Sequence, residues 1–165
     1  MNLGAQIAKS GILYFLHADT LPPISFAQDI QQALLKGFDL GCYRSTYPAK
    51  NVPLLQINAY FTRFDQHWCR GGDQSLFIKK EVFEYCKGFR KDFIIMEDFD
   101  FIERARKKHS FIIMSKDILI STRKYEQNGY LKVQLANFIV FSMYRLGFSQ
   151  KKLFQTYRRI LKWHY

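Results

Sequence analysis

Short apolar runs alternate along this chain with longer stretches in which apolar residues recur every three or four positions. The run Ile12 to Leu16 is short and continuous, which is typical of a strand buried on both faces of a parallel sheet. The other predicted strands are Phe38 to Tyr43, Ser75 to Ile78, Phe111 to Met114 and Ile118 to Thr122. The predicted helices are Ala5 to Lys9, Phe26 to Lys36, Asn51 to Trp68, Glu81 to Lys87 and Glu97 to Lys108, followed by two helices from Tyr130 onward that break near Gly147.

This alternation of helices and strands predicts an α/β domain with a mostly parallel sheet flanked by helices. The chain opens on a helix, whereas a doubly wound sheet normally starts from a strand, so we expect the first strands of the domain to be missing. Residues 1–128 then form the sheet-bearing part, and residues 129–165 form a helical extension of the same domain.

Composition narrows the class of protein without naming a partner. The hydrophobic fraction is 48%, the net charge is +11, and no apolar stretch is long enough to span a bilayer, which indicates a globular protein that favours anionic partners. Nucleic acid, acidic lipid and phosphorylated substrates all suit that charge. Cys42, Cys69 and Cys86 form no C-x-x-C pair, which argues against a zinc site and fits reduced thiols in a cytoplasm.

The first polar cluster with chemical potential is His17-Ala18-Asp19-Thr20, directly after the strand Ile12 to Leu16. Ligands of open α/β sheets bind beyond the carboxyl ends of strands, and a carboxylate there can hold Mg²⁺ or Mn²⁺ on phosphate oxygens. For this motif alone the structural interpretation is the stronger one: Asp19 then only caps the turn before Pro22.

Three further clusters carry polar groups at element ends. Gly72-Asp73-Gln74 combines a flexible backbone with hydrogen-bonding side chains that suit sugar hydroxyls, or it is an ordinary turn. Glu97-Asp98 follows an apolar run and offers a general base whose pKa burial would raise, or it complements a helix dipole. Arg123 and Lys124 offer cations for a diphosphate, or they form a solvated basic turn.

The order and spacing of these clusters together resemble glycosyltransferase family two, which has the GT-A fold, and in particular its bacterial subgroup with a Leu-His-Ala-Asp-Thr motif. The resemblance covers nearly the whole chain. The stretches that carry it are Met1 to Gly11, Phe15 to Thr20, Gly72 to Gln74 with Phe77, Met96 to Asp98, and Ser121 to Tyr125.

The resemblance implies a hexosyltransferase-like, inverting enzyme that uses a nucleotide-sugar donor and a divalent metal, Mg²⁺ or Mn²⁺. Asp19 and His17 stand where the family has its D-x-D metal motif, with His17 in place of the first acid. Asp98, next to Glu97, stands where the family has its base. The implied donor and acceptor contacts are Gly72, Asp73, Gln74, Arg123 and Lys124.

The resemblance also implies that the chain starts at an internal position of the family, so we expect a truncated form with weakened donor binding. Two functions from different classes stay open. The chain is a glycosyltransferase acting on a carbohydrate or lipid-linked acceptor, or it is a non-catalytic remnant or interaction module that keeps only the acceptor side of the fold. A nucleic-acid-binding role fits least, because no motif for it is present.

The C-terminal region mixes aromatic and aliphatic residues with cations such as Lys151, Lys152, Arg158 and Arg159. A basic, aromatic-rich helix suits an anionic membrane surface. The alternative is a helix packed on the domain with a solvated basic face. We favour partial membrane contact, which predicts a cytoplasmic protein peripheral to the inner face of the membrane.

Overall fold

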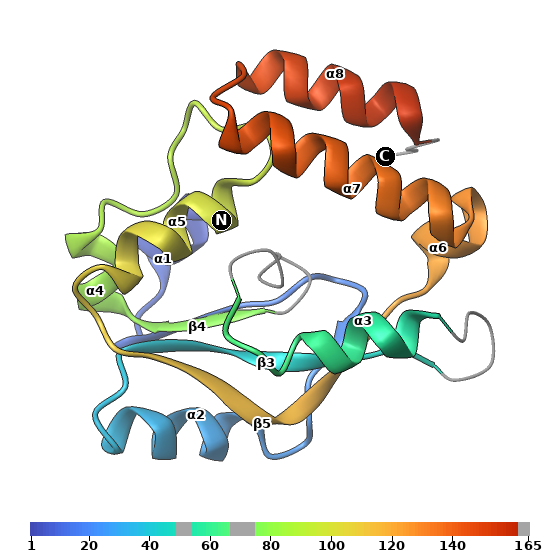
Figure 1. Cartoon of the computed structure of the whole chain (residues 1–165). Helices are drawn as coiled ribbons and strands as arrows, with labels where there is room; N and C mark the ends of the chain where they lie inside the picture. The colour runs from blue at the N-terminus through green and yellow to red at the C-terminus, as the bar shows by residue number, and fades with distance from the viewer. Residues whose placement is uncertain (49–53, 67–74, 162–165) are drawn as a thin grey trace.

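The computed structural model of the chain describes residues 1–48, 54–66 and 75–161. Helices and strands alternate along it, which confirms the α/β class (Figure 1). The strands are β1 (Ile12–Phe15), β2 (Thr20–Leu21), β3 (Leu40–Thr46), β4 (Leu76–Lys79) and β5 (Phe111–Ile120). The helices are α1 (Asn2–Ile7), α2 (Phe26–Leu35), α3 (Leu55–Phe61), α4 (Lys80–Tyr85), α5 (Glu97–Arg106), α6 (Arg123–Asn128), α7 (Tyr130–Arg145) and α8 (Gln150–Ile160).

The five described strands form one mixed sheet in the order β1-β4-β3-β5-β2. Only the β3–β5 pairing is parallel, and the other three pairings are antiparallel. The expectation of a mostly parallel sheet is therefore wrong for these strands. A short apolar run fits a buried strand of either direction, because direction depends on the path of the connection and not on the burial of side chains.

Strand β1 is also less buried than its unbroken apolar run predicts. It lies at one end of the strand order, where Leu13 is buried and Ile12, Tyr14 and Phe15 are only half-buried. Its four residues pair antiparallel with β4, from Ile12 opposite Lys79 to Phe15 opposite Leu76. Residues 16–19, which follow β1, line the cavity described below.

The centre of the sheet is β3, which is the most buried strand. Gly41 lies where β3 passes between β4 and β5, and a Cβ at this position would come within 2.5 Å of both the Ile112 carbonyl oxygen and the Phe77 ring. Only glycine therefore allows this close approach of three strands. Fully buried Tyr43 and Phe77 fill the adjacent space.

The helices cover both faces of the sheet. Helix α2 lies on one face, and α7 and α8 lie one above the other over the opposite face (Figure 1). Ile30 of α2, Tyr43 of β3 and Val133 of α7 belong to one buried cluster, so the C-terminal helices pack into the same core as the sheet. A second cluster joins α1, α4 and α5 to β1, β3 and β4 around Phe83 and Phe101.

Several local assignments differ from the sequence-based ones. Thr20–Leu21 forms the short strand β2, which was not predicted, and within the described residues the helix predicted from Asn51 to Trp68 is confined to α3. The segments Phe111 to Met114 and Ile118 to Thr122 belong to one strand, β5, whose register shifts where Tyr43 opposite Met114 is followed by Arg44 opposite Asp117. This bulge accommodates two extra residues without ending the strand. The basic segment at Arg123 is the start of helix α6 rather than a turn at a strand end.

No helix in the described part of the chain is long and apolar enough to cross a bilayer.

Candidate functional site

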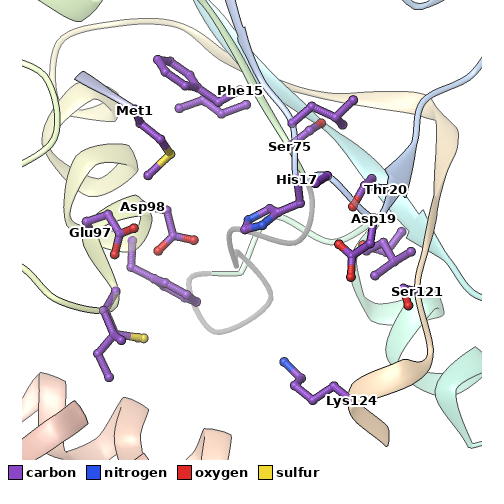
Figure 2. Close-up of a pocket in the computed structure, with 18 of the residues that line it drawn as sticks. Met1, Phe15, His17, Asp19, Thr20, Ser75, Glu97, Asp98, Ser121 and Lys124 are labelled. Atoms are coloured by element: carbon purple, nitrogen blue, oxygen red, sulfur yellow. The ribbon is translucent and has the colours of Figure 1, made fainter. Parts of the chain in front are cut away.

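A cavity of about 1300 Å³ lies between the sheet and the helices that cover its upper face. Its lining comes from Met1 and α1, from β1 and the loop after it, from the start of α5, and from α6 and α7. All the predicted site residues that the structure describes line this cavity: His17, Asp19, Glu97, Asp98, Arg123 and Lys124. Figure 2 shows five of them around the cavity: His17, Asp19, Glu97, Asp98 and Lys124.

The β1–β2 loop, residues 16–19, forms one wall. It is held at both ends, because β1 pairs with β4 and Thr20 of β2 pairs with Ile120 of β5. A hydrogen bond of 3.1 Å from the Thr20 N–H to the His17 carbonyl closes the turn between them. The Asp19 side chain is half exposed and therefore open to a ligand.

Thr20 is buried, and its Oγ1 has no hydrogen-bond partner among the described residues. A buried hydroxyl without a partner is destabilising, so such groups are uncommon in folded proteins. Its place beside Asp19 leaves one polar oxygen of this wall without a partner among the described residues.

Helix α6 brings cations to the same wall. The Arg123 Nη2 lies 3.7 Å from the Asp19 Oδ2, although both side chains are well exposed. Lys124 follows in the first turn of α6 and points toward the cavity (Figure 2). The wall thus combines one carboxylate with two cations. This combination suits the binding of a metal–diphosphate ligand, and it suits a simple ion pair between Arg123 and Asp19 equally well.

The opposite wall carries the acidic pair at the start of α5. Glu97 and Asp98 are half-buried and line the cavity, and Figure 2 shows the Asp98 carboxylate reaching toward the His17 imidazole. The two later acids of α5 have other partners. Asp100 accepts a 2.8 Å hydrogen bond from Arg104, and Glu103 accepts one of 2.7 Å from Arg145.

The backbone immediately before Glu97 is strained. Met96 has φ 64°, a left-handed conformation that costs a non-glycine residue about 1–2 kcal/mol. Met96 is the residue directly before α5, so its conformation helps to set the direction in which Glu97 and Asp98 leave the loop. Strained residues of this kind concentrate at functional sites, where the surrounding structure holds them in place.

The loop that precedes Met96 is fixed by α8. The Gln150 side-chain oxygen accepts hydrogen bonds from the N–H groups of Ile94 and Ile95, at 3.1 and 3.3 Å. The rings of Phe99 and Phe141 lie 5.7 Å apart, which adds a contact between α5 and α7. The position of the acidic pair therefore depends on the C-terminal helices.

Several polar residues of the cavity escaped the sequence-based prediction, among them Tyr14, Ser75 and Gln134. Tyr14 of β1 donates a 3.3 Å hydrogen bond to the Ser75 hydroxyl, and burial raises the pKa of the Tyr14 phenol. The Ser75 backbone is left-handed, with φ 66°. Gln134 of α7 has a buried Nε2 without a partner in the described chain. Tyr14 and Gln134 lie inside a strand and a helix, where no local pattern distinguishes them from ordinary packing residues.

The fit of a divalent metal to this site rests on few protein ligands. No group of three or more His, Cys, Asp or Glu residues gathers anywhere in the ranges 1–48, 54–66 and 75–161. Mg²⁺ and Mn²⁺ need no such group when substrate phosphates complete the shell, because one or two carboxylates and water suffice. Asp19, with His17 beside it, meets that smaller requirement.

Gly72, Asp73 and Gln74 lie outside the described residues, so their predicted contacts with donor or acceptor remain sequence-based. The Ser75 that follows them lines the cavity. No protein-family model matches the chain, and no curated protein sequence matches it either.

Proposed function

We propose that this chain is a glycosyltransferase with a GT-A-like fold that transfers a sugar from a nucleotide-sugar donor to an acceptor hydroxyl. One observation carries the proposal. A single cavity holds an acidic pair, Glu97 and Asp98, on one wall, and Asp19 with Arg123 and Lys124 on the facing wall. Group transfer from a diphosphate leaving group needs these two functions in one space.

Asp98 acts as the general base. Its carboxylate accepts the proton of an acceptor hydroxyl while that oxygen forms a bond to the anomeric carbon. The bond from the anomeric carbon to the diphosphate oxygen breaks in the same displacement, and the nucleoside diphosphate leaves with the electron pair. Attack from the face opposite the leaving group inverts the anomeric centre, and the transition state resembles the oxocarbenium ion of glycoside hydrolysis.

The facing wall stabilises the leaving group. Arg123 offers a planar fork of donors to the diphosphate oxygens, and Lys124 adds a second positive charge. Asp19 and His17 are the residues that would hold a divalent ion, which supplies positive charge to the departing diphosphate when bound. The Arg123 guanidinium already lies at this wall, 3.7 Å from the Asp19 carboxylate.

Release of nucleoside diphosphate from UDP- and GDP-linked hexoses, with Mn²⁺ present, tests the proposal. Donor hydrolysis by water needs no knowledge of the acceptor. The chain should release diphosphate, and Asp98→Asn should slow the release by roughly a hundred- to ten-thousand-fold while donor binding persists. Asp19→Asn should abolish the dependence on Mn²⁺.

Asp92→Asn is the matched control, because Asp92 is an exposed carboxylate that contacts Arg90 away from this cavity. It should leave donor release unchanged. A folded chain that neither binds nor cleaves any of these donors would overturn the proposal and favour the non-catalytic interaction module.

A further inference from the structure

The C-terminal part of the chain is free of acidic residues. From Gln127 to Tyr165 the sequence holds no Asp or Glu and seven Lys or Arg residues, so most of the +11 net charge lies here. The described helices of this part, α7 and α8, pack against each other as a helical hairpin. A surface of one sign on one structural unit attracts a partner of the opposite sign.

The cations of α8 occupy one face of the helix. Lys151 and Arg158 are seven residues apart, as are Lys152 and Arg159, so two turns bring each pair onto the same side. All four are exposed, and none forms an ion pair with a described residue. The opposite side carries fully buried Leu153, which packs into the hairpin.

Helix α7 exposes an apolar stripe where a surface helix normally has polar residues. Leu131, Leu135 and Phe138 follow each other at spacings of four and three, with 78%, 55% and 70% of each residue exposed. The buried residues Val133 and Ala136 lie on another side of the helix. Exposed Leu146 and Phe148 continue the apolar surface into the turn between the helices.

We infer that the α7–α8 hairpin is a docking surface for a bilayer that contains anionic phospholipids. The hairpin offers both of the groups that such an interface binds: Lys and Arg for the headgroups, and Leu and Phe for the acyl boundary. The Lys152 ammonium and the Arg158 guanidinium lie 5.9 and 5.6 Å from the Phe148 and Phe154 ring centres. A membrane–water interface favours cationic groups that lie next to aromatic rings and aliphatic chains, because the charge stays in water while the apolar part is buried.

Nucleic acid accounts for the cations but not for the stripe, because exposed leucines gain nothing from a phosphate backbone. The lipid surface accounts for both features. No helix described here spans a membrane, so the hairpin lies on the surface of the bilayer.

The hairpin also forms part of the cavity. Phe138 belongs both to the exposed stripe and to the cavity lining. A docked hairpin therefore brings the cavity to the membrane surface, within reach of a lipid-linked acceptor. This last step rests on the proposed function, whereas the docking itself does not.

Flotation with vesicles tests the docking independently of catalysis. The chain should float with phosphatidylcholine vesicles that contain about 30% phosphatidylglycerol at about 0.05 M salt, and much less at about 0.5 M salt. It should not float with phosphatidylcholine alone. Lys151→Glu with Arg158→Glu should weaken the binding by roughly tenfold or more, since each cation near such a surface strengthens it several-fold.

Two matched control pairs separate specific docking from the effects of net charge and of overall surface hydrophobicity. The double variant Lys36→Glu with Lys107→Glu makes the same charge change on exposed residues outside the hairpin. It should bind the vesicles far more strongly than the variant with Lys151→Glu and Arg158→Glu. The double variant Leu131→Gln with Leu135→Gln should weaken binding at both salt concentrations. The control, Ile24→Gln with Leu35→Gln, alters exposed apolar residues near the two ends of α2 and should not weaken binding. Circular dichroism checks that every variant is folded.

Absence of flotation at low salt would overturn the inference. So would an equal loss in the two charge variants, which would mean that net charge alone attracts the chain. A third outcome against it is tight binding to duplex DNA that displaces vesicles and is insensitive to the Leu131 and Leu135 changes. The donor-release assay above is independent of lipid, so failure of docking and failure of the proposed chemistry are distinguishable.

Discussion

Arg123 Nη2 lies 3.7 Å from Asp19 Oδ2, and this contact joins the loop after β1 to the start of α6. The two side chains are 72% and 50% exposed, so the pair contributes little to stability. A weak, solvent-accessible pair at the wall of a cavity can exchange its partner for a ligand at little energetic cost.

We therefore expect Arg123→Met to weaken the binding of nucleoside diphosphates by roughly ten- to a hundredfold, because a hydrogen bond to a charged group contributes about 1.5–3 kcal/mol. The affinity of Arg123→Lys should lie between those of the unchanged chain and Arg123→Met, since lysine keeps the positive charge but loses the paired donors of the guanidinium. Calorimetric titration with UDP and GDP in the presence of Mn²⁺ measures this. The thermal midpoint should stay unchanged in both variants, and an unchanged affinity would remove Arg123 from the site.

Met96 tests whether backbone strain positions the acidic pair. Met96→Gly removes the left-handed penalty of about 1 kcal/mol, so the chain should lose little stability although the Met side chain is gone. The start of α5 should become less rigid, and donor release should fall severalfold. Met96→Val should instead lower the free energy of unfolding by about 2 kcal/mol, because β-branched residues tolerate this conformation worst.

Lys87→Gly is the matched control for Met96→Gly. Lys87 has φ 60° and an exposed side chain, and it does not line the cavity. Its replacement should raise stability without changing donor release. If the two glycine variants altered release equally, the strain at Met96 would have no role in positioning Glu97 and Asp98.

Local patterns predicted helices better than they predicted the sheet. The acids at the start of Glu97–Arg106 and the basic residues at its end complement the helix dipole, and α5 lies where this polarity predicts it. Gly147, with φ 77°, separates α7 from α8 as expected. Strand direction was wrong because the connections that set it involve residues far apart in the sequence.

Helix α6 illustrates a signal that was present and missed. Thr122 donates a 2.6 Å hydrogen bond to Glu126, which ties the residue before the helix to its first turn. Thr is a favoured residue directly before a helix, but the two cations after Thr122 suggested a turn instead. The proximity of Asp19 to Arg123 had no local signal, because only the β2–β5 pairing brings their segments together.

Gly41 should be the glycine least tolerant of a side chain among those that the structure describes. A Cβ there would meet the Ile112 carbonyl and the Phe77 ring at 2.5 Å, so Gly41→Ala forces the central strands apart. We expect a loss of about 3 kcal/mol in the free energy of unfolding. Gly11→Ala, which meets no atom within 4 Å, should change it by less than about 0.5 kcal/mol, and urea titration of both variants makes the comparison.

Lys116, in the bulge of β5, should make stability depend on pH through Asp29 of α2. Its ammonium lies 2.8 Å from the Asp29 carboxylate, and this hydrogen bond lowers the pKa of Asp29; partial burial opposes the shift and the Ser25 hydroxyl reinforces it. A lowered pKa in the folded state means that the contribution is complete above about pH 4, the usual value of the unfolded carboxyl, and is lost as the pH falls through the folded pKa.

Lys116→Met should therefore lower the free energy of unfolding by about 0.5–1 kcal/mol at pH 7 and by almost nothing at about pH 2. Lys107→Met is the control, since exposed Lys107 forms no ion pair with any residue of the described ranges, and its effect should not vary with pH. Urea titrations of the three proteins between about pH 2 and pH 7 give the comparison. A difference for Lys116→Met that stays constant across this range would mean that Lys116 stabilises the β5–α2 contact by packing, and that the charge of Asp29 plays no part.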